Sequence, residues 1–154
     1  MHWADFTAKR LIERGRVQVT ASGITPSGEF HIGHLREILS AEMIHRSCID
    51  AGVQSEYIFI VDSMDPLRRV YDFLSPEYEK FIGHPLAYIP APSDDGRPGD
   101  GSTTYAEYFL DPFLDSLEQI GVNPKVVMNH ETYESGDFAN FIDLAITKKD
   151  SIKE

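Results

Sequence analysis

The strongest constraint on the fold is a strand, a turn, a helix and a second strand that follow one another between residues 17 and 61. Residues 17–21 are short and β-branched, residues 22–30 are rich in turn formers, and residues 34–51 carry apolar side chains at helical spacing. Residues 57–61 form a continuous apolar run, which is typical of a buried parallel strand. The pattern predicts a βαβ unit with a right-handed crossover.

The remainder of the chain continues the alternation of helices and strands. The patterns predict helices at residues 3–14, 104–120 and 138–148, a helical turn at 78–82 and a third strand at 125–128. Pro112 lies inside one helix, so we expect a kink or a restart there with Asp111 as the N-cap. Residues 83–102 are expected to form an irregular insert. The element order predicts an α/β fold whose parallel sheet is covered by helices on both faces.

Composition and charge exclude several classes of protein. The 154 residues suit one domain, and 42% hydrophobic with 25% charged residues is typical of a globular chain. No apolar run reaches the roughly 18 residues that a bilayer span needs, so no membrane role is expected. The single cysteine, Cys48, suits a reducing cytoplasm. A formal charge of −11 is unfavourable for an independent nucleic-acid binder.

The densest chemical signal is the sequence His31-Ile32-Gly33-His34, at the point where the first loop becomes a helix. A helix N-terminus offers unpaired N–H groups and a dipole that favours anions. The histidines are three residues apart, so both rings can reach one side of the first turn. There they would donate hydrogen bonds to a phosphate as a nucleoside triphosphate is attacked at its α-phosphate. Gly33 would let an adenine ring approach the backbone.

The alternative interpretation of an arbitrary His-x-x-His is a pair of surface histidines, or a satisfied pair near a helix cap. Zinc binding is disfavoured, because the spacing is not the i, i+4 of a helical zinc pair and no third ligand is obvious. No metal site formed by the protein alone is expected.

The wider stretch from Ala21 to Glu37 resembles the class I lysyl-tRNA synthetases, a form found mainly in archaea and some bacteria. His31-Ile32-Gly33-His34 matches the first signature of class I aminoacyl-tRNA synthetases, with Pro26-Ser27-Gly28 just upstream. Further matching segments are His2-Trp3-Ala4-Asp5, Asp62-Ser63-Met64-Asp65-Pro66-Leu67-Arg68, Gly83-His84-Pro85-Leu86 and Tyr133-Glu134-Ser135-Gly136. The similarity covers essentially the whole chain.

This resemblance implies that residues 1–154 are the N-terminal half of a Rossmann-like (HUP-type) catalytic domain. The second class I signature, Lys-Met-Ser-Lys-Ser, does not occur in the sequence. The second half of the fold and the anticodon-binding domain are not expected within this length. The family uses ATP and Mg²⁺ to activate L-lysine and then charges tRNA(Lys), whose main contacts would lie in the absent regions. We expect impaired activity for the chain alone, and self-association through its incomplete sheet.

The resemblance also assigns roles to individual positions. His31 and His34 would be the catalytic residues that contact the ATP phosphates. The ATP-binding residues would be Thr25, Pro26, Ser27, Gly28, His31, Gly33 and His34. Gly23 and Thr25 would lie against the lysine substrate.

Two aspartates after the second strand are further candidates for binding lysine. Asp62 and Asp65 follow a buried strand at the edge of the sheet where ligands bind, and a lysine ammonium needs a carboxylate partner in a partly dry pocket. The structural alternatives are a loop or helix cap for Asp62 and an Asp-Pro turn for Asp65. Arg68 is a candidate for binding phosphate or for pairing with these acids.

Two other functions remain open at this point. One is a small nucleotidyltransferase with a His-x-Gly-His loop, and the other is a non-catalytic synthetase relative that binds a nucleotide or an amino acid. Exchange of pyrophosphate into ATP that depends on one amino acid would separate the synthetase from both.

Overall fold

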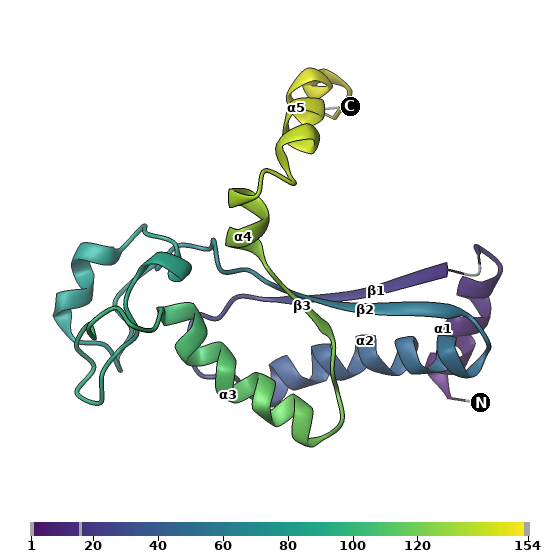
Figure 1. Ribbon diagram of the computed structural model, residues 1–154, viewed down its shortest axis with the longest axis horizontal. Helices are drawn as coiled ribbons and strands as arrows, with labels where there is room; N and C mark the ends of the chain where they lie inside the picture. Colours follow the sequence, from purple (N-terminus) through teal and green to yellow (C-terminus); the bar gives the residue numbers. More distant parts are fainter. Residues whose placement is uncertain (1, 16, 153–154) are drawn as a thin grey trace.

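The computed structural model describes residues 2–15 and 17–152, and its core is a parallel sheet (Figure 1). The strands are β1 (Val17–Ile24), β2 (Gln54–Val61) and β3 (Lys125–Met128), in the order β1-β2-β3. All eight residues of β1 pair with β2, whereas β3 pairs with only the last four residues of β2. Ile24, Val61 and Met128 are therefore aligned at one carboxyl edge. The α/β fold with a parallel sheet is confirmed.

The helices largely follow the predicted order. They are α1 (Trp3–Ile12), α2 (Ile32–Asp50), α3 (Tyr105–Gln119), α4 (Asn129–Glu134), α5 (Ala139–Thr147) and α6 (Lys149–Ile152), with 3₁₀ helices η1 (Pro76–Phe81) and η2 (Leu86–Tyr88). The pattern missed the short helices α4 and α6. Within the described residues, no helix combines the length and the apolar character that a bilayer crossing requires.

Helix α3 runs through Pro112 without a restart, contrary to that expectation. Thr104, rather than Asp111, is the N-cap, and its side chain exchanges hydrogen bonds with Glu107 in a capping box. Pro112 lies on the exposed side of the helix, where water can satisfy the carbonyl that loses its N–H partner. The neighbouring Phe113 stays buried, and packing on that face keeps the helix continuous.

Helices α2 and α3 lie on the same face of the sheet, as Figure 1 shows. Burial alternates along the strands, so Phe59 and Val61 are buried against these helices while Val17 and Val19 are 66% and 58% exposed. The expectation that both faces are covered is wrong for the described residues. Helices α4 and α5 lead away on the other side, and none of their residues is buried.

Two apolar clusters hold the site in place. The first lies between the sheet and helices α2 and α3, and includes Ile38, Phe59 and Phe113. The second fills the irregular region between β2 and α3 around Tyr78 and Tyr105. Burial raises the pKa of Tyr78 to about 12, which is the expected effect when a phenol is removed from water.

Candidate active site

The two signature histidines close the first turn of α2 themselves. His31 is the N-cap, and its Nδ1 accepts a hydrogen bond from the Gly33 N–H at 3.0 Å. In return, the His31 N–H donates to Nδ1 of His34 at 3.0 Å. The ring centroids are 4.0 Å apart with 32° between the planes. The pair works as a capping box built from imidazoles, which confirms that both rings share one side of the turn.

These hydrogen bonds decide which ring nitrogen carries the proton. Because each Nδ1 accepts from a backbone N–H, the neutral ring must hold its proton on Nε2. Burial of the His34 ring, and then the nearby His31, lower the pKa of His34, while Glu37 acts in the opposite direction. The helix therefore begins with imidazole Nε2–H donors that a phosphate oxygen can accept from without a formal proton transfer.

Gly33 has a steric reason to be glycine. A Cβ atom at this position would lie 2.7 Å from Cε1 and 2.9 Å from Nδ1 of His31. Real Cβ atoms essentially never come this close to another heavy atom. The His31 ring itself occupies the space that a side chain at residue 33 would need.

The loop before α2 is anchored from below by the core. Pro26 is fully buried, and the carbonyl of Ser27 accepts a hydrogen bond from the Tyr105 hydroxyl at 2.8 Å. A Cβ at Gly28 would lie 3.7 Å from the ring of Phe73, an ordinary contact. Phe30 stacks on Phe113 with centroids 4.3 Å apart. These contacts hold the predicted nucleotide loop against α3.

Asp65 joins the two predicted loops. Its Oδ2 accepts from the Thr25 hydroxyl at 2.9 Å and from Nη2 of Arg68 at 3.0 Å. Arg68 was expected to bind phosphate or to pair with an acid, and in the structure it pairs with Asp65. The Arg68 side chain is largely exposed. The negative charge of Asp65 is therefore offset by an ion pair with a cation of its own loop.

A cavity of about 370 Å³ opens at the carboxyl ends of β1 and β2. Its lining consists of Ala21, Ser22, Gly23, Ile24, Thr25, Glu37, Ile60, Asp62 and Asn129. Of the residues predicted to bind lysine, it brings together Gly23, Thr25 and Asp62, whereas Asp65 is not among the lining residues. Its ionisable side chains are two carboxylates, with no lysine or arginine among the described lining residues, so it suits a cationic ligand.

Two of these lining residues were missed by the sequence analysis. Glu37 lies one helical turn beyond His34, and its Oε1 accepts a long hydrogen bond, 3.4 Å, from the Gly23 N–H. Asn129 donates from Nδ2 to Oδ1 of Asp62 at 2.8 Å. The spacing from His34 and the position directly after the third strand were the available signals.

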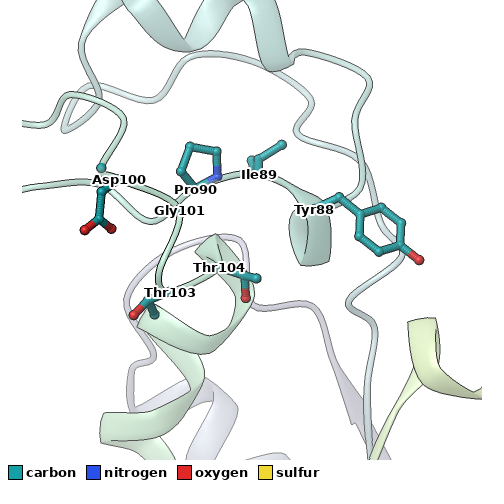
Figure 2. A pocket seen from close by; sticks show the side chains of 8 residues that line it. Tyr88, Ile89, Pro90, Asp100, Gly101, Thr103 and Thr104 are labelled. Atoms are coloured by element: carbon teal, nitrogen blue, oxygen red, sulfur yellow. The ribbon is translucent and has the colours of Figure 1, made fainter.

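Other hollows lie away from these residues. Figure 2 shows one of about 230 Å³ near η2 and the start of α3, with Tyr88 at one side of the view and Asp100 at the other. A larger one, about 1060 Å³, lies between the insert and α3 and is lined by several aromatic rings, including Phe73 and Phe109. Neither contains His31, His34 or Asp62. No group of three or more potential metal ligands occurs among the described residues.

Comparison with known proteins agrees with this geometry. The parallel sheet with its flanking helices is consistent with the Rossmann-like catalytic half of a class I aminoacyl-tRNA synthetase, and residues 1–154 match the family model described as tRNA synthetases class I (K). The chain belongs to this class I lysyl-tRNA synthetase family.

Similar proteins include three lysine–tRNA ligases. The protein from Methanosarcina barkeri is 40% identical over 152 residues, which are 99% of this chain and 27% of that protein. The protein from Picrophilus torridus is 39% identical over 153 residues, 99% of this chain and 28% of its own length. The protein from Methanocaldococcus jannaschii is 42% identical over 156 residues, 100% and 28% respectively. The chain thus spans little more than a quarter of the length of these relatives, and the match confirms the resemblance to class I lysyl-tRNA synthetases.

Proposed function

We propose that the protein uses ATP to activate L-lysine as lysyl-adenylate, the first step in charging tRNA(Lys). One observation carries the proposal: His31 and His34 close the first turn of α2, and Glu37, one turn further along the same helix, lines a cavity with two carboxylates. The first feature suits a polyphosphate and the second an amino acid with an extra ammonium group. The similar proteins are named lysine–tRNA ligases, which supports lysine as the amino acid.

In the proposed reaction, a carboxylate oxygen of lysine attacks the α-phosphorus of ATP. A bond forms between that oxygen and phosphorus, the bond to the bridging oxygen breaks, and pyrophosphate leaves. His31 and His34 donate hydrogen bonds to the phosphate oxygens as their negative charge grows, and the N-terminus of α2 adds its dipole. No nucleophilic side chain is required.

The nucleotide lies on the loop that leads into α2. The ATP site consists of the loop residues Thr25, Pro26, Ser27 and Gly28 together with Gly33 in the first turn of α2. Burial of Pro26 and the hydrogen bond from Tyr105 to Ser27 keep this loop rigid. Mg²⁺ enters with the ATP phosphates, because phosphate oxygens and water are its usual ligands in such sites.

Lysine occupies the cavity at the carboxyl ends of β1 and β2. Asp62 and Glu37 provide the negative charge for its ammonium groups, and Gly23 leaves room beside the strand. Thr25 lines the same cavity, and its hydroxyl is fixed by Asp65. In this proposal Asp65 acts on lysine through Thr25, and Arg68 through Asp65.

Transfer of the lysyl group to tRNA(Lys) is proposed to rely mainly on regions outside this chain. The chain spans about 28% of the length of its relatives, and its net charge of −11 is unfavourable for the main contacts with a polyanion. A cytoplasmic site of action follows from this role. Val17, Val19 and Ile60 on the open sheet face are proposed to cause self-association when nothing else covers them.

The test is exchange of labelled pyrophosphate into ATP, measured with each of the amino acids in turn. We expect exchange that needs lysine and that falls by at least about 100-fold in a His31→Ala/His34→Ala variant, since loss of a single oxyanion donor commonly has this effect. His84→Ala, which removes an exposed histidine outside the site, is the matched control. Exchange without lysine, or exchange that survives the double substitution, would contradict the proposal. Calorimetry with ATP shows whether an inactive protein still binds the nucleotide.

A further inference from the structure

Neighbouring residues at the ends of β2 and β3 are tied together in two separate pairs. Asn129 donates to Oδ1 of Asp62 at 2.8 Å, and the Oγ atom of Ser63 lies 2.8 Å from Nδ1 of His130. The His130 N–H also donates to Ser63 Oγ at 3.2 Å. The register aligns Val61 with Met128, so the segments that follow β2 and β3 leave the sheet side by side. The first pair faces the cavity and the second is outside its lining.

The first pair leaves one oxygen of the Asp62 carboxylate able to accept hydrogen bonds from a ligand. Oδ1 of Asp62 is held by the Asn129 amide, and within residues 2–15 and 17–152 no donor reaches Oδ2. A carboxylate bound at one oxygen has a defined plane, so the position of the other oxygen is defined too. The side chain of Asp62 is therefore oriented before any ligand arrives, which reduces the entropy lost on binding.

The chemical nature of the donor distinguishes the two aspartates of this loop. Asp65 is paired with the cationic guanidinium of Arg68, which offsets its charge. Asp62 is held by a neutral amide, which fixes the carboxylate and leaves its negative charge in place. Of these two aspartates, only Asp62 combines a defined orientation, an uncompensated charge and a place in the cavity lining.

We propose that Asn129 is a positioning residue for the amino-acid site, and that it holds Asp62 so that Oδ2 receives an ammonium group of lysine. This inference rests on the proposed function. It assigns a role in substrate recognition to the first residue of α4, which lies outside the histidine signature.

The experiment uses the protein as its gene encodes it and compares wild type with Asn129→Ala. Pyrophosphate exchange gives the KM for lysine and the KM for ATP separately. We expect the KM for lysine to rise about tenfold, the order expected when a hydrogen bond to a charged group is lost, while the KM for ATP stays the same. A purely structural role would not separate the two values in this way.

Two further variants keep the result interpretable. Ser63→Ala breaks the neighbouring tie to α4 without changing the cavity lining, so it should lower Tm and leave the KM for lysine unchanged. The double substitution Asp62→Asn/Asn129→Asp keeps an amide and a carboxylate hydrogen-bonded to each other but moves the negative charge from residue 62 to residue 129. This variant should keep nearly the wild-type Tm and still bind lysine as poorly as Asp62→Asn alone.

The outcomes separate this inference from the proposed function. Wild-type protein without lysine-dependent exchange would overturn both. Wild-type exchange together with an unchanged KM for lysine in Asn129→Ala would overturn only the role of Asn129. An equal rise in Ser63→Ala would also overturn it, because the effect would then come from the displacement of α4.

Discussion

Replacement of Gly33 by alanine separates the stability of α2 from the function of its histidines. The added Cβ would lie 2.7 Å from Cε1 of His31, so the ring must move by roughly 0.7 Å to reach an ordinary contact of 3.4 Å. The same movement lengthens the 3.0 Å hydrogen bond from Gly33 N–H to Nδ1 to roughly 3.7 Å, which no longer counts as a hydrogen bond. The backbone itself is not strained, because Gly33 does not have a positive φ.

Two opposing terms act on stability. Loss of the cap costs about 1 kcal/mol, and alanine in place of glycine inside a helix contributes about 0.5–1 kcal/mol. The free energy of unfolding should therefore change by less than about 1 kcal/mol. Activity should respond far more strongly, because displacement of the His31 ring removes one phosphate donor and lowers exchange by about 100-fold.

A double-mutant cycle tests this reasoning. In a His31→Ala background there is no ring to displace, so Gly33→Ala should raise the free energy of unfolding by about 0.5–1 kcal/mol and lower the residual exchange much less than it lowers exchange in the wild-type background. Urea unfolding and pyrophosphate exchange of the four proteins give both quantities. Equal effects of Gly33→Ala in the two backgrounds would refute the proposed contact between residue 33 and the His31 ring.

Three further predictions concern the support of the site and the open sheet. Tyr105→Phe removes the hydroxyl bonded to the Ser27 carbonyl and should destabilise the protein by about 1–2 kcal/mol in urea unfolding, whereas no loss would mean that water replaces the hydroxyl. The pKa of His34 is lowered on folding, so its contribution to stability is present above the ordinary histidine pKa and is lost as pH falls from there to the lowered value. In urea titrations at a series of pH values, the free energy of unfolding should depend less steeply on pH in His34→Gln than in the wild type. An unchanged dependence on pH would assign it to other groups. Val19→Lys places a charge on the open face, where Val19 is 58% exposed, and should reduce self-association in sedimentation experiments. The control Ala51→Lys, at the end of α2, should leave self-association unchanged. Equal behaviour of both variants would show that the open face is not the contact surface.

Local patterns predicted most of the helices and strands that carry the candidate site but failed at specific points. Helix α3 continues through Pro112 because Phe113 and its neighbours pack on the opposite side, which a rule about proline in an isolated helix does not include. The sequence predicted an incomplete sheet but not which of its faces is open. Val17 and Val19 have the apolar character of a strand covered on both sides, and composition alone does not reveal which face the described helices leave uncovered.

The sequence by itself determined the βαβ order and the position of His31 and His34 at the start of a helix. Both depend on interactions between residues a few positions apart, such as helical periodicity and the reciprocal cap across three residues. Only the tertiary structure decided that Asp65 pairs with Arg68 while Asp62 faces the cavity with Asn129. Asp62 and Asn129 are 67 positions apart, and their contact exists only because β2 and β3 end side by side in a parallel sheet.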